Sequence, residues 1–251
     1  MTDPNQPTPV AGFIVLDKPL GFSSAKTVAA VKGRLRRGGQ PKSIKVGHAG
    51  TLDPLATGVL VILVGKATRL QDKVMAGEKR YLAGIDLSAF TTTDDAEGER
   101  EEIAVESPPS RAQIDSVLAE HFTGEIQQTP PVFSAIKQGG KRAYAEARAG
   151  REVTMQPRPV TVHSIGVVAY DYPSLTLDIA CGKGTYIRSI ARNLGERLGT
   201  GGSLSSLQRT RVGEFVIEDS VILDDLPDPL LVSELRTNDE TRALIAKHTQ
   251  A

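Results

Sequence analysis

The sequence predicts an α+β protein with a largely antiparallel or mixed sheet. Residues 174–181 alternate apolar with polar or small side chains, which is typical of a half-buried strand. Apolar residues recur at helical spacing in two other stretches, 110–122 and 186–198. Strand-like and helical segments follow one another without the regular alternation that gives a parallel sheet, and this favours the α+β class.

The N-terminal part is predicted to begin with a strand and a helix. Residues 12–17 form the strand, and the turn KPLGFSS follows it. Ser23 or Ser24 can cap a helix that runs to about Arg36, because a serine hydroxyl accepts a hydrogen bond from a free amide of the first turn. The apolar run 59–64 suits a buried strand or a core helix segment. Further strands are predicted at 79–88 and 160–170.

Two more helices are expected in the second half of the chain. Ser110 and Gln113 form a capping-box pattern at the start of the first of them. The second begins near Tyr186 and carries apolar residues at core spacing. If that apolar stripe faces the core, Arg188 and Arg192 share the opposite, accessible face.

The composition is that of a globular protein with a substantial core. The 251 residues are 39% hydrophobic and 24% charged. No run of about 18 apolar residues occurs, and the polar start lacks a secretory pattern, so we expect no membrane segment and a disordered lead-in at residues 1–10. The single cysteine, Cys181, fits a reducing cytosol. We therefore expect a cytoplasmic protein.

The charges are segregated along the chain although the formal net charge is zero. Seven lysines and arginines and no acid lie between Lys26 and Lys45, whereas seven acids and one arginine lie between Asp94 and Glu106. Local potential governs phosphate binding more than total charge does, so the first segment predicts a basic face for nucleic acid. The alternative is that both segments are ordinary solvated faces.

The stretch 47–58, GHAGTLDPLATG, presents one carboxylate, Asp53, among glycines, small residues and one imidazole, His48. Pro54 and the glycines predict an irregular loop, which the following apolar run can anchor. An acid on a rigid loop is how a scaffold presents a reactive group. The alternatives are that Asp53 forms a turn or caps a helix, and that His48 is an ordinary hydrogen-bonded loop residue.

Other motifs argue against phosphate-loop, dinucleotide and metal chemistry. VGKAT at 64–68 lacks the first glycine of a phosphate-binding loop, and CGKGTYIRS lacks the spacing of a dinucleotide fingerprint. The four histidines are scattered and the one cysteine stands alone, so we expect neither a metal nor a cofactor. Tyr81, Tyr144 and Tyr186 lie beside cations, which suits unstacked bases and phosphates. The alternative is that they are packing residues, which tyrosines at strand starts commonly are.

The loop at 47–58 resembles the signature loop of the TruB family, the tRNA pseudouridine-55 synthases. The likeness covers roughly residues 11–216, because further blocks resemble the family in the correct order. The chain departs from the family at Ser88 and Thr92, where a glycine and an acid are usual. The blocks are DKPLGFSS at 17–24, KRY at 79–81, TTTDDAEGE at 91–99, PPVFSAIKQGGKRAYAEAR at 130–148, GKGTYIRSIARNLGERLG at 182–199 and LSSLQRTRVGEF at 204–215.

The resemblance implies the pseudouridine synthase fold with a central RNA-binding cleft. It also implies an isomerase that acts on uridine 55 in the T-arm loop of tRNA. In that reaction the nucleotide flips out of the loop, the bond from N1 to the ribose breaks, the base turns, and C5 joins the ribose. The family needs no cofactor for this exchange.

The same resemblance assigns the site residues. Asp53 acts at C1′ of the ribose, either as a nucleophile or by removing a sugar proton. Arg188 is the cation that keeps Asp53 ionised, and Tyr81 stacks on the base and helps to remove the C5 proton. The substrate-binding residues are Tyr186 and Leu207 in the uridine pocket, His48 in the space left by the flipped nucleotide, and Lys18 and Pro19 beneath the pocket.

The implied organisation is a catalytic domain at 11–216 and a short tail at 217–251. The tail is predicted as a terminal helix from about residue 232, and it is too short for the RNA-binding PUA domain of many members. The expected partner is the T-arm of tRNA, with a monomeric enzyme and no obligatory protein partner. The alternatives are a non-catalytic tRNA-binding or folding chaperone, a guide-RNA-dependent synthase, and a glycosidase-like hydrolase, which would need a second carboxylate.

Overall fold

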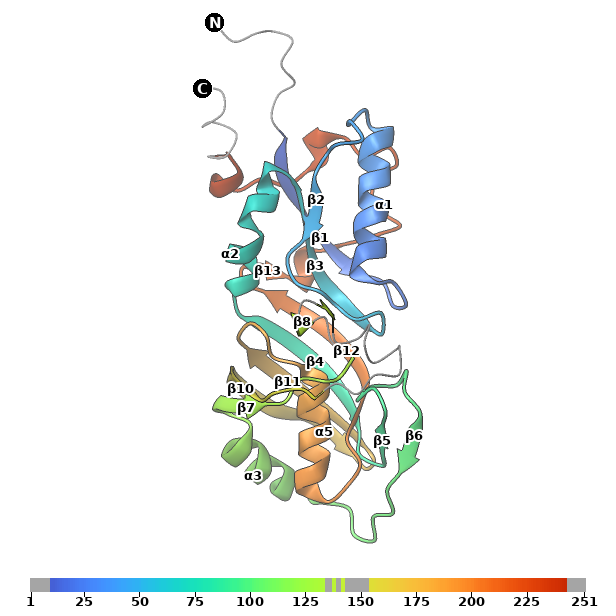
Figure 1. The fold of residues 1–251 in the computed structure, drawn as a ribbon, viewed down its shortest axis with the longest axis vertical. Helices are drawn as coiled ribbons and strands as arrows, with labels where there is room; N and C mark the ends of the chain where they lie inside the picture. The colour runs from blue at the N-terminus through green and yellow to red at the C-terminus, as the bar shows by residue number, and fades with distance from the viewer. Residues whose placement is uncertain (1–9, 134–136, 139–140, 143–153, 243–251) are drawn as a thin grey trace, which may run out of the picture. The chain divides into compact units, whose positions relative to one another are not determined.

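The computed structural model describes residues 10–133, 137–138, 141–142 and 154–242, and it divides into two compact units (Figure 1). The first unit comprises Met1–Gly77 and Arg209–Ala251, and the second comprises Glu78–Gln208. One strand, β12 (Ser203–Val212), begins in the second unit and ends in the first. Tyr144 and positions 1–9 of the predicted lead-in lie outside the described residues.

The strands of the first unit are arranged around a long antiparallel pair. β1 (Ala11–Lys18) pairs along its whole length with β3 (Ala56–Gly65). β14 (Val221–Ile222) adds to β1 in parallel, β2 (Val46–His48) adds to β3, and β13 (Phe215–Val216) folds back on the end of β12. The helical elements are α1 (Ser24–Arg37), α2 (Gln71–Ala76) and the 3₁₀ turns η1 (Lys66–Leu70), η2 (Ile217–Asp219) and η3 (Val232–Glu234).

The core of the first unit is built on β1 and β3. The apolar run 59–64 lies in β3, where it pairs with β1 and is buried throughout, so it is a strand and not a helix segment. Phe13 of β1 meets Phe215 of β13 edge to face, with ring centroids 5.2 Å apart, and Val74 of α2 packs against the same cluster. A strand that is buried on both faces needs a continuous apolar sequence, and this explains why 59–64 does not alternate.

The second unit holds four antiparallel strands in the order β4 (Lys79–Asp86), β11 (Ser174–Cys181), β10 (Arg158–Asp171) and β7 (Gly124–Gln128). The helix α3 (Arg111–His121) packs against β10 and against α5 (Ile187–Leu198). Two small hairpins complete the unit: β5 (Ala89–Thr91) with β6 (Arg100–Glu102), and β8 (Lys137–Gln138) with β9 (Lys141–Arg142).

The predicted fold class is confirmed, since the strand pairs just described are antiparallel apart from β1 with β14. The predicted caps are also confirmed. The Ser23 hydroxyl accepts a hydrogen bond from the Lys26 amide at 3.1 Å, and Ser110 and Gln113 form a complete capping box on α3. These caps are local features, which is why spacing alone predicts them.

Two local predictions differ from the structure. Arg188 is buried and Arg192 is half-buried, so the face of α5 that was expected to be accessible is covered. Within the described residues, the helix expected over about 232–251 starts only at Asp239, after the 3₁₀ turn η3, and positions 243–251 of this prediction lie outside them. Before it, the backbones of Arg236 and Phe13 exchange two hydrogen bonds of 2.9 Å, and these bonds replace the helical ones. Among the described residues, no helix has the length and apolarity needed to cross a membrane.

Candidate active site

The Asp53 loop joins β2 to β3 in the first unit, and the opening turn of the chain holds its backbone. The Ser24 hydroxyl donates to the carbonyl of Leu52 at 2.9 Å and accepts from the Leu52 amide at 2.8 Å. The Gly21 amide donates to the carbonyl of Pro54 at 2.8 Å. Both neighbours of the half-buried Asp53 are therefore tied to the start of α1 and the turn before it, which fixes the direction of the acid.

Arg209 holds the same loop from the other side. Its side chain is fully buried, and Nε donates to the carbonyl of Val59 at 2.8 Å while Nη2 donates to that of Gly50 at 3.0 Å. Gly50 and Gly58 have φ values of +109° and +98°, and a Cβ at Gly58 would lie 2.2 Å from the carbonyl oxygen of Arg209. The glycines of the motif are therefore required by backbone conformation and by this close approach.

Arg209 was not among the predicted site residues, although it lies in the block 204–215 that resembles the family. The signal that was available is its position in a strand two residues after Leu207, on the same side of the chain. A cation at an inward position of a strand must find acceptors, because burying an unpaired charge is costly.

Lys18 is fully buried at the end of β1, beneath the same loop. Its ammonium donates to the carbonyls of Pro19 at 2.8 Å, Phe22 at 2.6 Å and Pro54 at 3.4 Å. Burial lowers the pKa of Lys18 to about 8, against the opposing effect of the negative charges of Asp53 and Asp17. Lys18 and Pro19 therefore lie where they can support the loop that carries Asp53.

His48 is half-buried in β2, at the start of the loop. Burial and the positive charge of Arg209 lower the pKa of His48, while a hydrogen bond with the Gly50 backbone has the opposite effect. The lowered pKa favours a neutral imidazole at pH 7. The first unit thus carries four of the predicted site residues on this loop or on the segment that supports it: His48, Asp53, Lys18 and Pro19.

In the second unit, Tyr186 and Arg188 lie at the start of α5. Tyr186 is the N-cap residue, and the buried Gln128 side chain makes two hydrogen bonds with its backbone, of 2.8 Å to the amide and 3.0 Å to the carbonyl. The Arg158 guanidinium lies over the Tyr186 ring, 5.2 Å from its centroid, and donates to the carbonyl of Gly184 at 2.7 Å. Gln128 and Arg158 orient a predicted site residue, and the sequence carried no signal for either.

Arg188 has buried partners within the second unit. Its guanidinium lies 3.4 Å from the Asp95 carboxylate and donates to the carbonyls of Thr93 at 3.2 Å and Phe133 at 3.0 Å. These acceptors cover the side chain on the face of α5 that helical spacing predicted to be accessible. Asp95 was missed as a site residue, because in the sequence it is one of seven acids in a charged run.

Tyr81 and Leu207 are strand residues that are both 9% exposed. Tyr81 lies on β4 opposite Ile179 of β11, and Leu207 lies on β12. The structure therefore divides the predicted site residues between the units, with Tyr81, Tyr186, Arg188 and Leu207 in the second. The assigned roles of all eight residues stay predictions.

The basic segment 26–45 is only partly available for phosphates. Arg37 makes a bidentate ion pair with Asp228, with two contacts of 2.6 Å, and Arg34 donates to the carbonyl of Leu223 at 3.2 Å. Lys26 lies over the Phe22 ring but is exposed, as are Lys42 and Lys45. These three lysines are the strongest candidates in the segment for phosphate contact.

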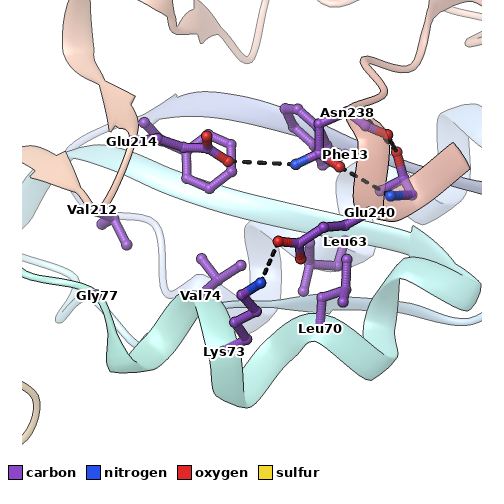
Figure 2. Close-up of a pocket in the computed structure, with 13 residues that line it drawn as sticks. Phe13, Leu63, Leu70, Lys73, Val74, Gly77, Val212, Glu214, Asn238 and Glu240 are labelled. Atoms are coloured by element: carbon purple, nitrogen blue, oxygen red, sulfur yellow. Dashed lines mark hydrogen bonds and ion pairs between the residues drawn. The ribbon is translucent and has the colours of Figure 1, made fainter. Parts of the chain in front are cut away.

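A pocket of about 240 Å³ in the first unit contains none of the predicted site residues (Figure 2). Phe13, Leu63 and Val74 contribute apolar surface, and Lys73 and Glu240, which form an ion pair, also line the pocket. No group of histidine, cysteine, aspartate or glutamate residues in the described part of the chain is arranged to hold a metal ion.

Two family models match the chain. The model of the TruB family pseudouridylate synthase N-terminal domain matches residues 36–187, and that of the tRNA pseudouridylate synthase B C-terminal domain matches residues 188–247. These matches and the fold define a pseudouridylate synthase. The chain belongs to the TruB family of these enzymes, as the sequence blocks predicted.

Curated relatives support this membership. The chain is 46% identical over 235 residues to a protein of Corynebacterium aurimucosum called tRNA pseudouridine synthase B, covering 91% of this chain and 75% of that protein. It is 44% identical over 236 residues to a protein of the same name from Streptomyces griseus, covering 90% of this chain and 77% of that one. The predicted family and class of enzyme are confirmed.

Solved structures show the same fold. A Cbf5–Nop10–Gar1 complex contains a chain that is 30% identical, with a TM-score of 0.66 over 90% of this chain. An H/ACA RNP bound to a substrate RNA containing 2′-deoxyuridine contains another, also 30% identical, with a TM-score of 0.63 over 86% of this chain. This chain spans 59% and 52% of the length of those two chains.

Proposed function

We propose that this enzyme converts uridine to pseudouridine at position 55 in the T-arm loop of tRNA. The observation that carries the proposal is membership of the TruB family, together with relatives named tRNA pseudouridine synthase B that match about nine-tenths of the chain. The reaction breaks the bond between N1 and C1′ and forms one between C5 and C1′. The C5 proton leaves and N1 regains a proton, so atoms and electrons balance without a cofactor.

Asp53 is proposed to act at C1′ of the flipped nucleotide. This proposal is supported by the hydrogen bonds that hold the loop. Ser24, Lys18 and Arg209 all bind backbone groups within a few residues of Asp53. A carboxylate held in one direction loses little entropy when the ribose arrives. It can bond to C1′ or remove a sugar proton, and both routes require its ionised form.

Arg188 is proposed to keep Asp53 ionised in the substrate complex. Burial raises the pKa of a carboxyl group, and a guanidinium with planar geometry opposes this most effectively. Tyr81 is proposed to stack on the uracil and to assist removal of the C5 proton. Tyr186 and Leu207 are proposed to line the uridine pocket, His48 to fill the space of the flipped nucleotide, and Lys18 and Pro19 to support the loop.

The proposed partner is the T-arm stem–loop alone, bound by a monomer in the cytoplasm without a guide RNA. The exposed lysines of segment 26–45 support phosphate contacts with the RNA, and the single cysteine fits a reducing compartment. The catalytic domain is proposed to span 11–216 and the tail 217–251.

The test is one assay of purified protein on a synthetic T-arm hairpin, with pseudouridine detected by carbodiimide labelling. We expect labelling at the position equivalent to 55, with protein and hairpin as the only components. Binding without labelling would favour the chaperone, and labelling only with a guide RNA and partner proteins would favour the guide-dependent type. Release of free uracil would indicate a hydrolase.

A further inference from the structure

Two arginines one turn apart on α5 meet two consecutive aspartates. Arg188 approaches the Asp95 carboxylate at 3.4 Å, and Arg192 forms an ion pair with Asp94. Residues four apart on a helix lie on the same face, so both ion pairs form along one side of α5. The side chains of Arg192 and Asp94 are 22% and 13% exposed, so the second pair is also largely covered.

The backbone at Asp94 is arranged to make both contacts. Asp94 has φ of +62°, and no other non-glycine residue in the described ranges has a positive φ. Aspartate tolerates this left-handed conformation better than most residues, but the conformation still needs stabilisation from its surroundings. The turn is held by the Asp94 amide, which donates to the carbonyl of Thr91 at 3.2 Å. The consequence is that successive carboxylates, at 94 and 95, both reach α5.

Arg192 also binds the segment that follows β7. Its Nη2 donates to the carbonyl of Thr129 at 3.0 Å, and the Ser189 hydroxyl donates to the same oxygen at 2.9 Å. Four residues further on, the carbonyl of Phe133 accepts from Arg188. Arg192 therefore ties to α5 the two segments, 93–95 and 129–133, that supply Thr93, Asp95 and Phe133 to Arg188.

The charges in this cluster depend on one another. Burial raises the pKa of Asp94, and the negative charge of Asp95 acts in the same direction, whereas Arg192 and Arg188 act against both. Without Arg192, Asp94 would lose its main counter-charge and would compete with Asp95 for Arg188. Because Asp94 is paired with Arg192, it does not compete with Asp95 for the guanidinium of Arg188.

We infer that Asp94 and Arg192 form a positioning couple that sets the guanidinium of Arg188 in its working direction. Neither residue touches the substrate in this scheme. The inference rests on the proposed role of Arg188 in pseudouridine formation. It concerns how this chain holds that residue and not which reaction the residue serves.

The test compares Asp94→Asn, Asp94→Gly and Arg192→Gln with the control Arg197→Gln, an exposed arginine in the last turn of the same helix. Asparagine and glycine both accept positive φ, so the turn is retained while the carboxylate charge is removed. We expect single-turnover rates at saturating enzyme to fall about ten- to a hundredfold, with tRNA affinity unchanged. The control should match the wild type.

The double variant Asp94→Asn/Arg192→Gln should be about as slow as the slower single variant, because residues that act as a unit are not additive. In parallel, the guanidinium NMR signals of Arg188 should shift or broaden in each variant but not in the control, and this readout does not require turnover. Rates like the wild type's in folded variants, additive losses, or unchanged Arg188 signals would overturn the inference. An inactive wild type with shifted Arg188 signals in the variants would instead reject the proposed function alone.

Discussion

Arg209 donates a hydrogen bond of 3.0 Å to the carbonyl of Gly50, although the two residues are 159 positions apart in the chain. The same guanidinium holds Val59 on the far side of the Asp53 loop. A buried strand residue thus fixes both ends of the loop, and its positive charge also acts on His48.

Replacing Arg209 by glutamine is expected to loosen this loop and to change the titration of His48. The backbone carbonyls of Gly50 and Val59 would be left without their donor, and an unsatisfied buried acceptor costs roughly 1–3 kcal/mol. Loss of the positive charge should raise the pKa of His48, which NMR of its ring protons would measure. Arg211→Gln, two residues along the same strand but exposed, is the control. An unchanged His48 titration would contradict the electrostatic coupling.

Asp53→Asn is expected to abolish turnover while leaving tRNA binding nearly intact, because the substitution removes the charge and little else. Since the negative charge of Asp53 raises the pKa of Lys18, the same change should lower that pKa further. Product formation, filter binding and NMR of the Lys18 ammonium measure these three effects. The exposed Asp72→Asn is the control. A parallel loss of binding and turnover would mean that Asp53 is structural.

Lys18 is expected to make stability depend on alkaline pH. Below about pH 8 the ammonium is charged in both folded and unfolded chains; between about 8 and 10.5 the unfolded chain keeps a proton that the folded chain has lost. Stability contributed by this group therefore rises with pH in that window, by at most about 3 kcal/mol relative to Lys18→Met. Urea unfolding across this range measures the difference. The stability of Lys42→Met, at an exposed site, should change with pH in parallel with that of the wild type. If the stability of Lys18→Met also changed in parallel with the wild type, the pKa shift of Lys18 would be refuted.

Arg188→Lys is expected to be far more damaging than conservation of charge suggests. A lysine cannot meet Asp95 and the carbonyls of Thr93 and Phe133 with one planar group. We expect the single-turnover rate to fall about a hundredfold or more, with unchanged tRNA affinity. The matched variant is Arg197→Lys on the exposed face of the same helix, which should be neutral. Near wild-type activity of Arg188→Lys would show that the planar fork is dispensable.

Neutralising Lys26, Lys42 and Lys45 together is expected to flatten the salt dependence of tRNA binding. Each lost phosphate contact should reduce the slope of log affinity against log salt by up to about 0.9. Binding titrations at several salt concentrations measure it. Arg37→Gln is the control, because the charge of Arg37 is already paired with Asp228. An unchanged slope in the triple variant would remove this segment from the RNA-binding face.

The sequence by itself determined the helices α1, α3 and α5, the caps of α1 and α3, and the family, because each depends on neighbours within a few positions or on contiguous motifs. For 59–64 it left a buried strand and a core helix segment both open. It did not reveal the supports of the site. Arg209, Asp95 and Gln128 act on residues 58 to 159 positions away, and spacing along a chain carries no record of such distances. Helical periodicity predicted an accessible Arg188, whereas the side chain is buried. Only the tertiary structure decided that, because buried acceptors from two distant segments outweigh the exposure that the pattern favours.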